Sequence, residues 1–153
     1  MSNESDAPTE ATVNFAAMCA NFNIRKAARA VTSFYDAMLQ PTGMRSTQGT
    51  LLMALSLGGS MTISRLAESL VMDRTTLARD LKPLEEQGLV RIAPGADRRT
   101  RQLELTKAGR DKLREIIPLW EQAQAKIIGA GLGQDRWRQL HRELQEVIRL
   151  AQE

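Results

Sequence analysis

Two short segments with helical spacing follow one another closely in the middle of the chain, and this pairing restricts the fold more than any other feature. The first segment starts after Thr62, a residue type that caps helix N-termini. Its apolar residues recur with helical spacing: Ile63, Leu66, Ala67 and Leu70. Asp73 can cap the second segment and Gly88 can end it, which leaves only Val71 and Met72 as a turn. The spacing therefore predicts a helix-turn-helix.

The second of these helices has two faces of different chemistry. Leu77, Leu81 and Leu84 share one side, so they must face the core. The opposite side and its flanks are mostly polar: Arg74, Thr75, Thr76, Arg79, Lys82, Pro83 and Glu86. Arginine can pair with two guanine acceptors, threonine can contact base edges and lysine suits phosphate, so this side predicts contact with DNA. The alternative is an ordinary solvated helix face, which is the more common place for exposed Arg and Lys.

A predicted β-hairpin follows this helix. Residues 90–92 and 102–105 alternate apolar and polar side chains as half-buried strands do, and residues 94–97 are typical of a turn. Three arginines crowd the tip of the hairpin, where no core requires them: Arg98, Arg99 and Arg101. Arginine enters a narrow, negative minor groove well, so the hairpin predicts a second DNA contact. We expect Asp97 to orient Arg99 or to cap the turn.

Together these segments resemble one family of regulators. The run Asp73-Arg74-Thr75-Thr76-Leu77, then EEQGLV (residues 85–90) and DRRTRQLELTKAG (residues 97–109), resembles the MarR family of winged helix-turn-helix proteins. The wing signature is Asp-x-Arg followed by Leu-Thr-x-x-Gly, and the resemblance covers residues 48–113. It implies a homodimer with interlocked terminal helices and two DNA-binding lobes. It also implies a transcriptional repressor that a small ligand or an oxidant releases from its operator.

The rest of the chain predicts further helices. Aromatic residues make up only 4% of the sequence, which favours packed helices over a large sheet. We expect a mainly α fold with a small β wing, built as a single domain over residues 11–153. Residues 46–106 form the winged helix-turn-helix, residues 11–45 and 107–153 form dimerisation helices, and residues 1–10 are a disordered lead.

Several helix boundaries can also be predicted. Residues 12–40 should form one helix, and Ser46 should cap the next. Thr106 should cap a long helix that reaches Ile128, and residues 129–133 should break the chain before a final helix. The outer helices carry more apolar surface than the central motif can cover, which favours a homodimer over a monomer in which they pack on each other.

Charge and composition narrow the function classes. The formal net charge is +3, and residues 11–153 carry +6 because the first ten residues hold three acidic and no basic side chains. This charge is compatible with double-stranded DNA as a partner. The chain has one cysteine and no signal-like or membrane-spanning stretch, so we expect a cytoplasmic protein without membrane contact. The rival class is a winged-helix module that binds an acidic protein.

Enzymatic functions fit the sequence poorly. His141 is the only histidine, so neither a catalytic triad nor a His-rich metal site can be assembled within the chain. We therefore expect no catalytic residues, no cofactor and no metal.

The resemblance also suggests where a trigger acts. Family effectors, often aromatic acids or phenols, sit between the dimerisation helices and the DNA-binding lobe. The matching positions are Phe22, Arg25 and Arg29 in the first helix, and Met44, Arg45 and Gln48 at the entrance to the second. An arginine beside apolar side chains would suit a carboxylate on an apolar body, although Arg25 and Arg29 are equally consistent with solvated or ion-paired residues.

Cys19 offers a redox alternative. In the organic-hydroperoxide branch of the same family, a cysteine early in the first helix senses peroxide. Aligning Arg29 and Tyr35 on the corresponding residues of that branch places Cys19 two positions out of register. Free cysteine is also a common small core residue, so the ligand hypothesis is favoured.

Overall fold

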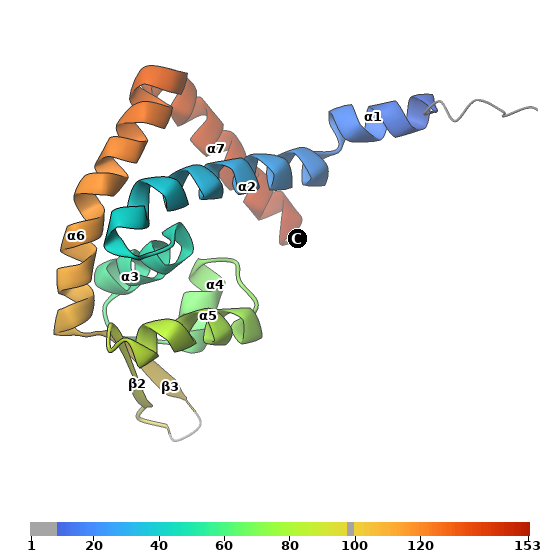
Figure 1. The fold of residues 1–153 in the computed structure, drawn as a ribbon. Coiled ribbons are helices and arrows are strands. Elements are labelled where there is room, and N and C mark those ends of the chain that lie inside the picture. Colours follow the sequence, from blue (N-terminus) through green and yellow to red (C-terminus); the bar gives the residue numbers. More distant parts are fainter. Residues whose placement is uncertain (1–8, 98–99) are drawn as a thin grey trace, which may run out of the picture. The chain divides into compact units, whose positions relative to one another are not determined.

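A computed structural model describes residues 9–97 and 100–153 of the chain (Figure 1). The described residues form two units that divide between Phe34 and Tyr35, within a single helix. Residues 1–8 of the predicted lead, and Arg98 and Arg99 of the predicted hairpin tip, lie outside the described residues.

The first unit begins with helix α1 (Glu10–Met18), and helix α2 (Ala20–Leu39) starts after it. Thr9 caps α1 by accepting a hydrogen bond from the Thr12 backbone N–H at 3.3 Å, so Thr9 and Glu10 belong to this helix rather than to the lead. The prediction of one helix over residues 12–40 was wrong at Cys19, where the backbone is extended. The Asn23 side-chain amide donates to the Cys19 carbonyl at 3.0 Å, which stabilises the break by a cap that apolar periodicity does not reveal.

The second unit holds the end of α2 and all later elements. In chain order these are the 3-10 helix η1 (Gln40–Thr42), α3 (Ser46–Gly58), β1 (Met61–Thr62), α4 (Ile63–Ser69), α5 (Arg74–Glu86), β2 (Val90–Pro94), β3 (Arg101–Leu105), α6 (Lys107–Gln124), the π-helix η2 (Ala125–Leu132) and α7 (Gln134–Ala151). The mainly helical fold with a small sheet is the predicted one. Helices α4 and α5 lie on either side of the predicted turn, and β2 and β3 form the predicted wing (Figure 1).

The sheet has one more strand than the sequence predicted. Its order is β1-β3-β2, and both pairs are antiparallel. Met61 pairs with Leu103 and Ile92 pairs with Leu103 from the other side, so the two-residue strand β1 covers the second edge of β3. A strand of two residues is too short to show any alternation, so β1 could not be predicted from the apolar pattern.

Helix α3 begins differently from the prediction. Ser46 is its first residue rather than its N-cap, which is Arg45. The Asp36 carboxylate of α2 accepts hydrogen bonds from both the backbone N–H and the hydroxyl of Ser46, each at 2.7 Å. Donation from the Ser46 backbone N–H is the main reason why the pKa of Asp36 lies below its usual range. The cap therefore comes from a residue ten positions earlier in the chain, which local sequence signals could not identify.

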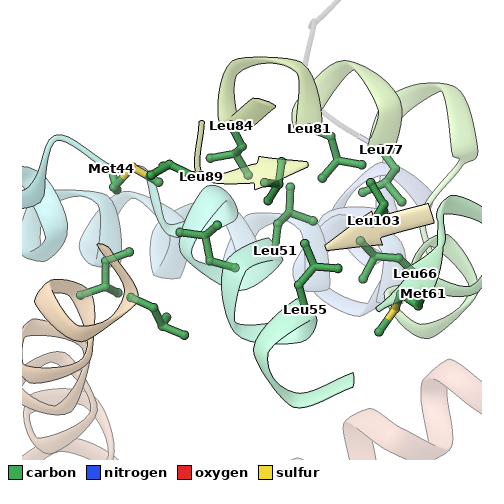
Figure 2. Packing of buried hydrophobic residues seen from close by; sticks show 14 of the residues in the cluster. Met44, Leu51, Leu55, Met61, Leu66, Leu77, Leu81, Leu84, Leu89 and Leu103 are labelled. Carbon is green, nitrogen blue, oxygen red and sulfur yellow. The ribbon is translucent and has the colours of Figure 1, made fainter. Parts of the chain in front are cut away.

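The hydrophobic core joins α3, α5 and the sheet. Leu77, Leu81 and Leu84 are fully buried, as predicted, and they point toward Leu51 and Leu55 of α3 and Leu103 of β3 (Figure 2). Burying a leucine side chain contributes about 1.5–3 kcal/mol, so this cluster fixes which side of α5 faces inward.

The start of α6 packs tightly against the end of the helix-turn-helix. Thr106 caps α6, as predicted, because its hydroxyl accepts from the Gly109 backbone N–H at 3.0 Å. The same hydroxyl lies 2.7 Å from the Gly88 carbonyl and 3.0 Å from the Leu89 carbonyl. Gly109 comes so close to this segment that a Cβ atom would lie 2.1 Å from the Leu89 carbonyl oxygen. The Thr and Gly of the wing signature therefore join the segment just before β2 to α6.

The predicted break at residues 129–133 is confined to its last residue. Helix α6 ends at Gln124, and the backbone continues as the π-helix η2 to Leu132. Gly133, with a φ of 82°, separates η2 from α7, and its N–H donates to the Ile128 carbonyl at 2.7 Å. Gly129 and Gly131 thus lie inside a helical segment, although glycine usually indicates a break there.

Candidate nucleic-acid interface

The N-termini of α4 and α5 are fixed by the two predicted caps. The Thr62 hydroxyl accepts from the Arg65 backbone N–H at 3.2 Å. The Asp73 carboxylate accepts from the backbone N–H groups of Thr75 and Thr76 at 2.9 and 3.0 Å, and these bonds, with that of Thr76 the largest cause, lower the pKa of Asp73. Both caps are confirmed.

The turn between the two helices contains a strained residue. Val71 has a φ of 52°, in the left-handed region that β-branched residues rarely adopt. Its N–H donates to the Glu68 carbonyl at 3.2 Å, and the Met72 N–H donates to the Ala67 carbonyl at 2.8 Å. These two bonds hold the tight turn that sets the direction of α5 relative to α4.

Helix α5 presents the predicted polar side to solvent. The Arg79 and Lys82 side chains are 76% and 74% exposed, Thr75 is exposed, and Thr76 is partly buried. The opposite leucines are fully buried, so α5 cannot rotate about its axis without exposing the core. The two-faced arrangement predicted from the sequence is confirmed, while the contacts of these residues with DNA stay a prediction.

The basic residues of α5 differ in their partners. Arg79 Nε lies 3.6 Å from Asp80, and Lys82 Nζ lies 3.9 Å from Glu86. Exposed pairs of this kind contribute little to stability and are readily exchanged. Arg74 donates from Nη1 to the Ser64 hydroxyl of α4 at 3.0 Å. Neither Asp80 nor Ser64 was predicted at this site; the helical spacing of Lys82 and Glu86 does indicate their pairing.

The described part of the wing tip is closed by Thr100. Its backbone N–H and its hydroxyl each donate to the Asp97 carbonyl at 2.8 Å, and its carbonyl accepts from the Gly95 N–H at 2.8 Å. Arg101 is the exposed first residue of β3, opposite Pro94. The predicted role of Asp97 toward Arg99 involves a residue outside the described ones and stays a prediction.

A polar network crosses the outer face of the sheet. Arg91 of β2 and Glu104 of β3 are direct cross-strand partners and form an ion pair, which lowers the pKa of Glu104. The Ser60 hydroxyl lies 3.4 Å from Glu104 and accepts from the Gln102 amide at 2.9 Å. This network was not predicted from the sequence. The strand register, once assigned, places Arg91 and Glu104 opposite each other and could have indicated it.

The residues predicted to hold an effector fall into the two units, so each set is described separately. Phe22, Arg25 and Arg29 lie on α2 in the first unit and are exposed. In the second unit Met44 is 4% exposed and belongs to the core. The Gln48 side chain accepts from the Arg45 backbone N–H at 3.0 Å and so helps to cap α3. The effector site stays a prediction.

Cys19, the candidate redox residue, is the partly buried C-cap of α1. Its carbonyl accepts from both the backbone and the side chain of Asn23. These contacts involve the backbone of Cys19 and not its thiol.

Across residues 9–97 and 100–153, none of the helices is both long and apolar enough to span a bilayer.

Comparison with known proteins gives consistent matches. A family model described as MarR family matches residues 42–100. An uncharacterized HTH-type transcriptional regulator of Bacillus subtilis (strain 168), YwoH, is 33% identical over 93 residues, which cover 61% of this chain and 68% of the relative.

Solved structures show the same similarity over most of the chain. The transcriptional regulator MosR of M. tuberculosis in complex with DNA is 37% identical, with a TM-score of 0.80 over 88% of this chain and 96% of that chain. Bordetella bronchiseptica BpsR, whose DNA binding is regulated by 6-hydroxynicotinic acid, has a TM-score of 0.77 over 92% of this chain and 97% of that chain. At 20% identity this second match shows a shared fold.

Proposed function

Since the chain belongs to the MarR family of winged helix-turn-helix transcriptional regulators, we propose that it is a repressor that binds a specific operator as a homodimer and leaves it when a small ligand binds. The observation that carries this proposal is the two-faced helix α5. Its leucine face is locked into the core, and its cationic face is about three-quarters exposed at Arg79 and Lys82.

In this proposal α5 enters the major groove. Arg79 pairs with guanine O6 and N7, Thr75 and Thr76 contact base edges, and Lys82 contacts phosphate. The acidic partners Asp80 and Glu86 are held at 3.6 and 3.9 Å by exposed pairs, so DNA can replace them at small cost. The wing, through Arg101 and the neighbouring arginines 98 and 99, follows the minor groove.

The proposed homodimer is supported by helix α7. None of the 18 residues of this helix is buried. Three apolar side chains that recur along it with helical spacing remain 39–41% exposed: Leu140, Val147 and Ile148. An amphipathic helix with its apolar side in water favours association with a second copy. A twofold dimer would place two α5 helices in successive major grooves, so we expect a pseudopalindromic operator with half-sites about 10 bp apart.

The proposed trigger is a small aromatic or phenolic acid. Arg25 and Arg29 of α2 are exposed and could bind its carboxylate. Regulation of BpsR, a protein of the same fold, by 6-hydroxynicotinic acid supports this class of ligand. Oxidation at Cys19 is the alternative trigger, and a comparison of aromatic acids with an organic hydroperoxide would distinguish the two.

The experiment that tests DNA recognition starts with selection of duplexes from a random pool by the wild-type protein. Arg79→Ala should reduce the preference for the selected duplex over a scrambled one by about 1–3 kcal/mol, because a bidentate base contact is lost. Arg99→Ala should weaken binding to both duplexes, because it removes groove electrostatics. Arg114→Ala on α6, paired with Asp111, removes the same charge and is the matched control.

Equal and sequence-independent losses for Arg79→Ala and Arg99→Ala would show that α5 does not read bases. Failure to enrich any duplex would favour the rival function, in which the cationic face binds an acidic protein. Sedimentation of the wild type tests the dimer: a stable monomer at micromolar concentration that protects one half-site would contradict it.

A further inference from the structure

The cations of α5 fall into two groups in the free protein. Arg79 and Lys82 each have a carboxylate neighbour on α5 itself. Arg74 has none: among the described residues, no carboxylate oxygen lies within ion-pair distance of its guanidinium. Its recorded partner is neutral, the Ser64 hydroxyl at 3.0 Å. No neighbouring carboxylate among the described residues therefore compensates the positive charge of Arg74, while its side chain is held in place.

Local stability does not explain an arginine at this position. Arg74 is the first residue of α5, where the helix dipole is positive and favours acidic side chains. A cation there is unfavourable unless an anion compensates its charge. Asp73 is already engaged, because its carboxylate caps the backbone N–H groups of Thr75 and Thr76. The charge of Arg74 is thus better matched to an anion from outside the chain.

The bond to Ser64 also sets the direction of Arg74. Ser64 is the second residue of α4, and α4 and α5 lie side by side (Figure 1). In a helix-turn-helix the first helix crosses the sugar-phosphate backbone, whereas the second enters the groove. A guanidinium tied to the first helix is therefore directed to the backbone rather than to base edges.

We propose that Ser64 is a positioning residue for DNA binding, which holds Arg74 against one phosphate and donates its own hydroxyl hydrogen to the same phosphate. The proposal rests on the proposed DNA-binding function and deepens it. Within the part of the chain that the structure describes, acceptance from Arg74 is the only side-chain hydrogen bond recorded for Ser64. Its hydroxyl hydrogen is therefore available as a donor, and four of the five guanidinium N–H groups remain for the phosphate.

The physical gain is preorganisation. An exposed arginine loses side-chain entropy when it is fixed on DNA, and the Ser64 bond removes part of this cost before DNA arrives. Loss of that bond should weaken binding about threefold at each half-site, the low end of the effect of one hydrogen bond. For a twofold dimer the two losses multiply, so the measured loss should be about tenfold.

The test is a double-mutant cycle. Affinities of the wild type, Ser64→Ala, Arg74→Ala and the double variant are measured by fluorescence anisotropy on a labelled duplex selected by the wild type. Each affinity is measured at several salt concentrations, all low enough that binding of Arg74→Ala can still be measured. Ser64→Thr restores the hydroxyl. Ser69→Ala is the matched control, because the Ser69 hydroxyl, in the same helix, donates to the Leu66 carbonyl at 2.9 Å and has no other side-chain hydrogen bond within the described residues.

We expect about tenfold weaker binding for Ser64→Ala, and binding within about twofold of the wild type for Ser64→Thr and Ser69→Ala. Arg74→Ala should reduce the slope of log affinity against log salt by about 1.8, the value for one phosphate contact in each half-site. The double variant should bind less than about threefold more weakly than Arg74→Ala alone, because without Arg74 only the contact of the serine itself with the phosphate is left to lose. The loss with Arg74→Ala should also be equal on selected and scrambled duplexes, because a phosphate contact carries no sequence information.

Two results would overturn the proposal. One is wild-type affinity for Ser64→Ala. The other is a full additional loss when Ser64→Ala is combined with Arg74→Ala, which would mean that the serine acts through the stability of α4 and not through the arginine. If instead the wild type shows no preference for its selected duplex, the proposed function fails, and this outcome is recognised before any variant is measured.

Discussion

Gly109→Ala should strongly destabilise the protein, because at this position α6 touches the segment just before β2 and the last residue of β3. A Cβ atom at Gly109 would lie 2.1 Å from the Leu89 carbonyl oxygen and 2.6 Å from a methyl group of Leu105, whereas real Cβ contacts stay beyond about 3.0 Å. The obstruction includes backbone, so a rotamer change cannot relieve it. The first turn of α6 has to move away from Leu89 by nearly 1 Å.

The size of the effect follows from what this movement breaks. The Thr106 N–H donates to the Leu89 carbonyl at 3.1 Å, and the Thr106 hydroxyl lies 3.0 Å from Leu89 O and 2.7 Å from Gly88 O. Each such bond contributes about 1 kcal/mol net, and overpacking a tight contact costs about 1–3 kcal/mol. We therefore expect the free energy of unfolding to fall by about 2–4 kcal/mol.

The assay is urea unfolding followed by circular dichroism at one fixed protein concentration, because the stability of a dimer depends on concentration. Gly129→Ala is the matched control. A Cβ at Gly129 would meet nothing within 4 Å, and alanine favours a helical backbone, so this variant should be as stable as the wild type or more stable by about 0.5–1 kcal/mol. A Gly109→Ala protein with unchanged stability would refute the close contact between α6 and Leu89.

Three further predictions concern other parts of the chain. Val71→Asn should raise the free energy of unfolding by about 1 kcal/mol, because asparagine tolerates the left-handed conformation at φ 52°; a lower urea midpoint would contradict the strain. Asp36→Ala should lower it by about 1 kcal/mol at pH 7 through loss of the α3 cap. Because donation from Ser46 lowers the folded-state pKa of Asp36, the difference in the free energy of unfolding between the wild type and Asp36→Ala should shrink as the pH falls below about 4. A difference independent of pH would show that the cap does not need the charge of Asp36. Cys19→Ser should leave release of DNA by aromatic acids intact, whereas Arg25→Ala should weaken it; release by peroxide alone, abolished in Cys19→Ser, would favour redox sensing.

The sequence predicted best the elements that local signals define. Caps at Thr62, Asp73 and Thr106 combine a short polar side chain with the apolar spacing that follows it, and all three are present. The inward face of α5 follows from the spacing of its leucines alone. These signals lie within one helical turn or one hairpin, where chain geometry leaves few alternatives.

Features that depend on distant residues were missed. Asp36 caps Ser46 from another helix, β1 exists only because β3 offers it an edge, and Arg74 bonds to Ser64 across the turn. The break at Cys19 was missed because the apolar pattern continues through it, while a side-chain amide compensates for the lost helical bonds. At Gly129 and Gly131 the opposite error occurred: the glycines predicted a break, but η2 continues through them as a π-helix.

We claim that the exposed face of α5 reads a DNA sequence, and salt-dependent binding is the decisive test. The measurement compares the affinity of the wild type for its selected duplex and for a scrambled duplex of the same length and composition, between 50 and 200 mM salt. We predict a steep fall with salt on both duplexes from phosphate contacts, and a preference for the selected duplex of at least about a thousandfold. Equal affinities for the two duplexes throughout this range would contradict the claim, because charge attraction alone would then account for binding.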